Sequence, residues 1–276
     1  MGKGIEMKKH NMAILVIGFD GYNDLWNDFF TLFHKYWDDC PYKIYLSNNT
    51  LDFPVQNVTT IHAGADAEWS RKAQIALEQI EEDYICLLLE DFYLGKRVDN
   101  KVVEKALNLM AEDDLNYYKL NTFTPFKTES YKEYPYLHII PENMEYGISL
   151  LPGIWKKEFL SEKLGKENYN AWKFECDRIA EEKGKTNKPL KGCVYDERNI
   201  LQIVHGVVQG KYLPEAVKYF EKRGYSLNQS KRQVMSFKEN FIYKTKRLSW
   251  PKPVKTVLKK ILRCFGMKFV TDQNSK

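Results

Sequence analysis

Cysteine is scarce in this sequence, and the cysteines form no recognisable pattern. The 276 residues contain five cysteines with no Cys-x-x-Cys pair, and the odd number excludes a complete disulfide framework. Such usage indicates a reducing compartment and argues against a structural zinc site.

Long hydrophobic runs are also lacking. No segment approaches the ~20 apolar residues that a membrane-spanning helix needs. The apolar run at 12–19 follows basic residues, as the core of a signal peptide does, but it leads directly into Asp20 and Gly21 without a small-residue cleavage site. We therefore expect this run to form the first β-strand.

Several catalytic signatures are absent. The sequence has no Walker phosphate loop and no GxGxxG motif, which argues against a P-loop NTPase and a standard dinucleotide enzyme. It also has no HExxH motif, no serine-nucleophile elbow and no matched Cys–His pattern. Hydrophobic residues at 43% and charged residues at 29% form an ordinary globular balance, which excludes a disordered or fibrous chain.

Excess positive charge is missing from most of the chain and concentrated at its end. The net charge is +5, yet residues 238–276 hold 11 basic and 2 acidic residues, which leaves residues 1–237 with a net charge of −4. A mildly acidic body is not typical of nucleic-acid-binding proteins, so we expect no nucleic-acid partner. We therefore divide the chain into a body, 1–237, and a basic appendage, 238–276.

Within the appendage, apolar residues recur at helical spacing. They are Val254, Val257, Leu258, Ile261, Leu262 and Phe265. Basic residues fill much of the remaining surface, and Trp250 precedes the pattern. These features predict a helix within 250–268 that lies on an anionic membrane surface. The alternative is a C-terminal helix docked on the protein's own body.

Strand and helix signals alternate along the body. Strands are expected at 13–19, 42–47, 58–64, 84–89, 117–121 and 193–206. Helices are expected at 24–37, 69–80, 99–111, 155–164, 171–183 and 213–223. The segment 122–148, rich in Tyr, Pro and Thr, is expected to be a long irregular loop. The alternation predicts an α/β fold with a mainly parallel sheet flanked by helices.

Polar residues follow four of the predicted strands, where ligands bind in open α/β sheets. The sharpest pair is Glu90-Asp91, at the end of a buried strand, because carboxylates there are suitable ligands for Mg²⁺ or Mn²⁺ beside a diphosphate. The plain alternative is a solvated strand end.

The order of these short motifs resembles a known family. A strand followed by Asp20-Gly21-Tyr22, a strand ending in Ser47-Asn48, a helix beginning Trp69-Ser70 and then LLLEDF (87–92) look like a nucleotide-sugar glycosyltransferase of the GT-A fold. More narrowly, the chain resembles bacterial enzymes that assemble capsular or lipopolysaccharide chains, over residues 12–225. The WKFE stretch (172–175) and the segment 206–216 are part of this resemblance.

The resemblance implies a donor site at the strand ends. Asp20, Tyr22, Ser47 and Asn48 would hold the base and ribose of the donor. On the helix that begins at Trp69, itself counted as a donor-site residue, Arg71 or Lys72 would face the diphosphate or donor sugar, since helix N-termini favour anions. Lys211 is a further candidate contact to the diphosphate.

The resemblance also implies a metal cation, although the corresponding motif matches only in part. Glu90 and Asp91 stand where the family has its Asp-x-Asp element, but a strict match would need an acid at Phe92. Mn²⁺ or Mg²⁺ held through Asp91, with Glu90 and His205, is one alternative. Metal-free catalysis with a basic residue (Arg71, Lys72 or Lys211) is the other, and His205 has a plain structural interpretation.

For catalysis, the resemblance points to Glu175 as general base, with Asp91 as the second catalytic carboxylate. An inverting transfer needs a carboxylate that takes the proton of the acceptor hydroxyl. Trp172, three residues earlier, would stack on an acceptor sugar. Asp177 is a weaker candidate base, and the alternative is that Glu175 is a surface charge and Trp172 a core residue.

The function expected from these features is transfer of a sugar from a nucleotide-diphosphate donor to a growing surface polysaccharide. A polyprenyl-linked acceptor in the cytoplasmic leaflet would explain the basic appendage, so the enzyme is expected in the cytoplasm, peripheral on the inner face of the membrane. The alternatives are a non-catalytic membrane-surface scaffold with an α/β body and, more weakly, a nucleotidyltransferase.

Overall fold

The computed structural model describes residues 11–122 and 127–247. A nine-stranded sheet forms the centre, in the order β3-β2-β1-β4-β9-β6-β10-β8-β7. Its strands are β1 (Met12–Ile17), β2 (Lys43–Asn48), β3 (Val58–His62), β4 (Tyr84–Leu89), β6 (Tyr117–Lys119), β7 (Ser130–Tyr131), β8 (Tyr134–Pro141), β9 (Gly153–Lys156) and β10 (Pro189–Asp196). The helices are η1 (Asp20–Tyr22), α1 (Asn23–Tyr36), α2 (Trp69–Gln79), α3 (Asn100–Glu112), α4 (Lys157–Leu164), α5 (Ala171–Glu182), α6 (Pro214–Glu221) and α7 (Phe237–Arg247).

The sheet is parallel across β3, β2, β1 and β4, and again between β6 and β10. Strand β9 runs antiparallel between β4 and β6. Strands β8 and β7 complete the other edge in antiparallel pairing. The predicted α/β fold with a mainly parallel sheet is confirmed, and β1 lies between two parallel partners, as its continuous apolar sequence requires.

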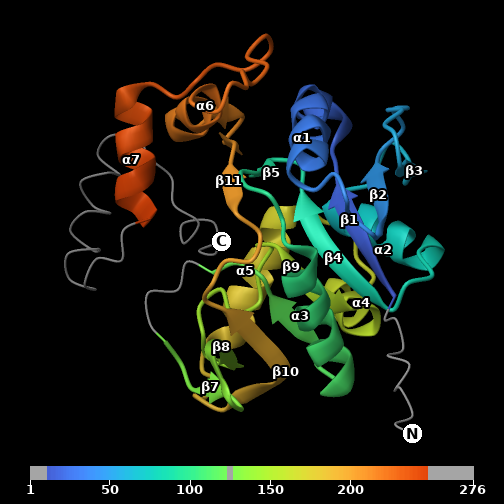
Figure 1. Cartoon of the computed structure of the whole chain (residues 1–276), viewed down its shortest axis with the longest axis vertical. Coiled ribbons are helices and arrows are strands. Elements are labelled where there is room, and N and C mark those ends of the chain that lie inside the picture. Colours follow the sequence, from blue (N-terminus) through green and yellow to red (C-terminus); the bar gives the residue numbers. More distant parts are fainter. Residues whose placement is uncertain (1–10, 123–126, 248–276) are drawn as a thin grey trace, which may run out of the picture.

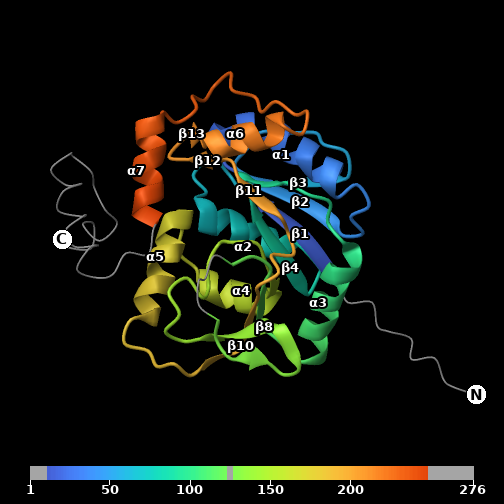
Figure 2. The same cartoon turned by 60° about the vertical axis from the view of Figure 1, so that its left-hand side comes forward.

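Helices cover both faces of the sheet, because successive strand residues point to opposite sides. Ile14 and Val16 of β1 pack with the apolar sides of α1, α3 and α6, whereas Ala13 and Leu15 pack with α2, α4 and α5. Figures 1 and 2 show these layers, with α1 and α6 near one end of the molecule and β7, β8 and β10 near the other.

Three expectations for the secondary structure were wrong in detail. The segment 122–148 is not wholly irregular, since it contains β7 and β8. The start of the helix expected at 155–164 instead belongs to β9, and α4 begins at Lys157. The strand expected at 193–206 is two strands in different sheets, β10 and β11 (Ile203–His205).

Two small sheets complete the described fold near the carboxyl end of β4. Strand β11 pairs antiparallel with β5 (Phe92–Leu94), so that His205 lies opposite Phe92. Strand β12 (Val207–Val208) pairs with β13 (Lys211–Tyr212). Gly206 joins β11 to β12 where a Cβ would lie 2.3 Å from the Tyr93 ring, so only glycine fits there without a shift. This close packing fixes His205 beside the end of β4.

Helix α7 lies against α6 and β13. Glu215 of α6 accepts from Asn240 Nδ2 at 2.9 Å and pairs with Lys244, and Lys211 Nζ lies 2.5 Å from Glu239 Oε1. No helix in the described parts of the chain is both long and apolar enough to span a bilayer. The helix expected within 250–268 lies outside the described residues, and the division at residue 237 stays a prediction.

Candidate active site

Glu90 anchors the loop after β1. It is buried, and its carboxylate accepts from the Phe19 backbone N–H at 3.1–3.2 Å and from Trp26 Nε1. Burial raises the pKa of Glu90 to about 8, against the opposing effect of these hydrogen bonds. The carboxylate is directed at the β1 loop and α1, and its expected role as a metal ligand stays a prediction.

Asp20 organises the loop after β2. Its carboxylate accepts from the backbone N–H groups of Asn49, Thr50 and Leu51 at 2.9–3.1 Å and from the Thr50 hydroxyl at 3.0 Å. Partial burial acts to raise the pKa of Asp20, but the backbone hydrogen bonds prevail and lower it. The strand ends of β1 and β2 are thus locked together, and a contact from Asp20 to a donor stays a prediction.

Ser47 and Asn48, the other expected donor contacts, are fully buried. Ser47 Oγ donates to the Lys72 backbone oxygen at 2.9 Å, and Asn48 Nδ2 donates to the Leu51 oxygen at 2.6 Å. Their side chains shape the edge of the sheet from inside, so a direct contact with a donor stays a prediction.

Arg71 and Lys72, adjacent in sequence, point to different places. Lys72 is buried, and its Nζ donates to Asn49 Oδ1 at 3.2 Å and lies 5.1 Å from the centre of the Phe19 ring. Burial lowers its pKa, which the charges of Glu90 and Asp20 oppose. Lys72 therefore places a cation at the strand ends.

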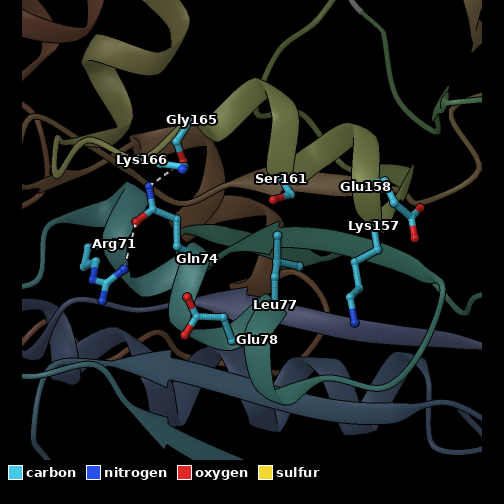
Figure 3. Close-up of a pocket in the computed structure, with 9 residues that line it drawn as sticks. All are labelled: Arg71, Gln74, Leu77, Glu78, Lys157, Glu158, Ser161, Gly165 and Lys166. Carbon is cyan, nitrogen blue, oxygen red and sulfur yellow. Dashed lines mark hydrogen bonds between the residues drawn. The ribbon is translucent and has the colours of Figure 1, made fainter.

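Arg71 instead faces an open hollow of about 570 Å³ between α2 and α4. Figure 3 shows its guanidinium beside Gln74, to which Nη1 donates at 3.3 Å, with Lys157 and Lys166 elsewhere on the rim. Gln74 in turn donates to the Gly165 backbone oxygen at 2.9 Å. This hollow contains none of the strand-end carboxylates, so the structure separates Arg71 from the other expected donor contacts.

Asp91 forms a pair with His205. His205 Nε2 lies 3.0 Å from Asp91 Oδ2, and the Asp91 backbone oxygen accepts from the Gly206 N–H at 2.8 Å. Both side chains are partly exposed. One carboxylate oxygen and one imidazole nitrogen at this spacing fit a divalent cation whose other ligands come from a diphosphate and water. In residues 11–122 and 127–247, no three acidic, His or Cys side chains gather as a complete metal site.

Glu175 lies on α5, close enough to this pair for the charges of His205 and Asp91 to influence its pKa. Burial is the largest influence and raises the pKa, while the Leu150 backbone N–H, which donates to Oε1 at 3.2 Å, opposes it. The structure thus brings together three predicted site residues that are far apart in sequence. Asp177, the weaker candidate base, instead forms a surface pair with Lys173 at 2.8 Å.

The two tryptophans of the predicted site differ in exposure. Trp69 is buried and packs on Phe174 of α5, with ring centres 5.2 Å apart, so it joins α2 to α5 from the core. Its expected contact with a donor stays a prediction. Trp172 is 52% exposed, which removes the alternative that it is a core residue. It lies one turn before Glu175 on α5.

Tyr22 and Lys211 are held by partners of their own. Arg232 lies 3.9 Å over the Tyr22 ring while it pairs with Asp24. Lys211 is paired with Glu239 of α7. Both stay candidates for contact with a donor, and Tyr22 also packs edge-on against Phe19, with ring centres 5.7 Å apart.

Sequence reasoning missed two notable residues at this end of the sheet. Phe19 ends the apolar run and was assigned to the strand, yet its ring is 51% exposed. Lys119 was taken as part of a strand, yet its buried Nζ reaches the loop beside α5 and acts on the pKa of Glu175. A charged residue within an apolar strand signal was the one available clue to Lys119.

No protein-family model matches this chain, and no curated protein matches it. Solved structures share its outline at low identity. The S. aureus TarS 1-349 structure is 10% identical with a TM-score of 0.39, over 68% of this chain and 60% of that chain. The Thermus thermophilus 2-C-methyl-D-erythritol 4-phosphate cytidylyltransferase is 11% identical with a TM-score of 0.42, over 78% of this chain and 100% of that chain.

A Drosophila β-1,4-galactosyltransferase 7 structure with manganese, UDP-Gal and xylobiose is 14% identical with a TM-score of 0.34, over 83% of this chain and 78% of that chain. The present chain thus spans about 60% of the length of the TarS 1-349 structure. At these identities and TM-scores the similarities give no residue a role, and the chemistry has to follow from the side chains of this chain.

Proposed function

We propose that this protein is a glycosyltransferase that moves a sugar from a nucleotide-diphosphate donor to a sugar hydroxyl. The observation that carries the proposal is the pair of Asp91 and His205 after β4, with Glu175 close enough for both charges to influence its pKa. A carboxylate with a raised pKa beside a second carboxylate and an imidazole can accept a proton next to a bound diphosphate.

The donor would lie across the ends of β1, β2 and β4. The exposed ring of Phe19 offers a face for a nucleobase, because bases stack on aromatic rings. Lys72 offers a positive charge close to the same ring. The hydrogen bonds of Glu90 and Asp20 hold the loops after β1 and β2, the first of which carries Phe19, and this limits the reorganisation needed for binding.

In the transfer itself, Glu175 takes the proton of the acceptor hydroxyl. The acceptor oxygen then forms a bond to the anomeric carbon, the bond from that carbon to the diphosphate oxygen breaks, and the nucleoside diphosphate leaves. This is an inverting displacement, with Glu175 as the base. The raised pKa makes Glu175 a stronger base than an ordinary glutamate.

Asp91 and His205 are the residues that would hold a Mn²⁺ or Mg²⁺ ion. When bound, such an ion neutralises charge that develops on the leaving diphosphate. Without it, His205 and Lys72 are available as hydrogen-bonding or cationic groups near the strand ends.

The acceptor is proposed to be a lipid-linked glycan of a bacterial capsule or lipopolysaccharide, reached from the cytoplasmic face of the membrane. The amphipathic pattern at 250–268 supports this location. Two exposed rings on α7 add support, since Phe237 is 89% and Phe241 63% exposed, one helical turn apart. They would enter the lipid interface together with the helix predicted within 250–268.

Asp91→Asn tests the assignment of the site. We expect at least a 100-fold loss of sugar transfer with an unchanged melting temperature, because Asn keeps the size of the side chain and removes its charge. The matched control is Asp38→Asn, which removes an exposed carboxylate paired with Arg97 outside the site. Full activity of Asp91→Asn would remove this cluster from the mechanism.

A further inference from the structure

Tyr146 is a bulky aromatic residue in a left-handed backbone conformation at an exposed turn. Its φ of +61° lies in the left-handed region, which is unfavourable for a side chain with a Cβ. Its ring is nevertheless 45% exposed, so burial of the aromatic surface does not explain why a bulky residue occupies this position. Strained residues that the fold maintains against this cost occur preferentially at functional sites.

Charged side chains on two elements hold the backbone of Tyr146. The buried Nζ of Lys119, on β6, donates to the Tyr146 backbone oxygen at 2.5 Å and to that of Gly147 at 3.5 Å. Oε2 of Glu182, near the end of α5, accepts from the Tyr146 N–H at 3.3 Å. Burial lowers the pKa of Lys119 to about 8, so keeping its charge there is costly. The buried ammonium group of Lys119 therefore stabilises the conformation of this turn despite the cost of its burial.

The segment that contains this turn contacts α5 at two positions, one of which is the proposed base. Glu182 contacts Tyr146, and Glu175, about two helical turns earlier, accepts from the Leu150 N–H. Burial, and then the negative charge of Glu175, raise the pKa of the Tyr146 hydroxyl, so the two side chains are close enough for their charges to interact. Trp172 lies one turn before Glu175 on α5 and is also exposed. Two exposed aromatic side chains are thus available near the proposed base.

We propose that Tyr146 recognises the acceptor, its ring packing on the sugar whose hydroxyl Glu175 deprotonates, together with Trp172. The ligand class is a pyranose, which presents a C–H face to an aromatic ring and hydroxyls to the carboxylate. This inference rests on the proposed glycosyl transfer. It gives the left-handed turn at Tyr146 a function, which is to hold the ring that selects the acceptor.

The test is steady-state transfer from UDP-glucose or UDP-N-acetylglucosamine to octyl glycosides of glucose, galactose and N-acetylglucosamine, in the full chain. With the best acceptor of this panel, Tyr146→Ala should raise the acceptor KM about 10-fold and the donor KM much less. Tyr146→Phe should stay near wild type, since it keeps the ring. Tyr146→Gly should show the same loss as Tyr146→Ala with a melting temperature at or above that of Tyr146→Ala, since glycine relieves the left-handed strain.

The control is Lys132→Gly, which changes another left-handed residue, φ +50°, on the hairpin between β7 and β8. Both KM values should stay at the wild-type level in this variant. Recovery of acceptor binding in Tyr146→Gly would show that the turn conformation matters and the ring does not, which would overturn the proposal. Unchanged acceptor KM in Tyr146→Ala would overturn it while leaving the proposed function intact. Absence of donor turnover in the wild type would overturn the proposed function and this inference with it.

Discussion

Replacing Glu90 with Gln should change how the stability of the protein depends on pH. Burial raises the pKa of Glu90 from 4.5 to about 8, a shift that corresponds to roughly 5 kcal/mol between the two protonation states. Between these two values the folded protein keeps a proton on Glu90 that the unfolded chain releases. The free energy of unfolding therefore falls as pH rises through this window.

Gln carries no titrating proton, and its oxygen can still accept from Trp26 or from the backbone of Phe19. The stability of Glu90→Gln relative to wild type should therefore rise by up to roughly 5 kcal/mol from pH 4.5 to pH 8, and change little below pH 4. Urea unfolding of both proteins at half-unit pH intervals measures this difference, and the contributions of other groups cancel. A difference independent of pH across this window would refute the assignment of Glu90 as a buried, largely protonated anchor.

Two further predictions concern other carboxylates. Asp20→Asn should destabilise the protein by about 1–2 kcal/mol at pH 7, through the loss of a charged acceptor for the β2 loop. Because the folded pKa of Asp20 is lowered, the stabilisation exists above 3.8 and is lost as pH falls below it, so urea unfolding should show the two proteins converging in acid. Glu175→Gln should lower kcat for transfer by roughly 10²–10⁴-fold with little change in the donor KM. Asp177→Asn, a surface carboxylate two residues further along α5, should keep wild-type kinetics, and equal losses in both variants would contradict the assignment of the base.

Much of the parallel half of the fold could be predicted from the sequence. Strands β1 and β4 are continuous apolar runs, and α1 and α2 show helical spacing of apolar residues, so local patterns identified them to within about two residues. Local sequence patterns failed where tertiary packing determines the secondary structure. Strand β9 has only four residues, runs directly into α4, and owes its strand conformation to pairing with β4 and β6.

The sequence could not predict which of the candidate site residues lie close together. The pair of Asp91 and His205 joins positions 114 residues apart, through the pairing of β11 with β5, which no local pattern reveals. The side chains of two adjacent residues, Arg71 and Lys72, point in different directions for the same reason. Lys72 faces inward and Arg71 outward because α2 packs on the sheet through one side, and the orientation of that side depends on residues elsewhere in the chain.

The sequence also could not predict which polar side chains are buried. Ser47, Asn48 and Glu90 follow strands, as ligand-binding residues do, but the structure uses their side chains to fasten the loops from inside. A strand-end polar residue can face a ligand or brace the loop that does so. The direction of the side chain decides between the two, and this direction depends on contacts such as that between Glu90 and Trp26.

Nucleotide binding tests the central claim most directly. Thermal melting of the full chain would be followed with UDP, GDP, CMP and TDP, each with and without Mn²⁺. A nucleotide present at 100 times its Kd should stabilise the folded protein by ~2.7 kcal/mol, a readily measured rise in Tm. The account predicts that one nucleotide raises the Tm well above the others and that Asp91→Asn removes any gain from Mn²⁺. An unchanged Tm with all four nucleotides would contradict a donor site at the strand ends and would favour a non-catalytic scaffold.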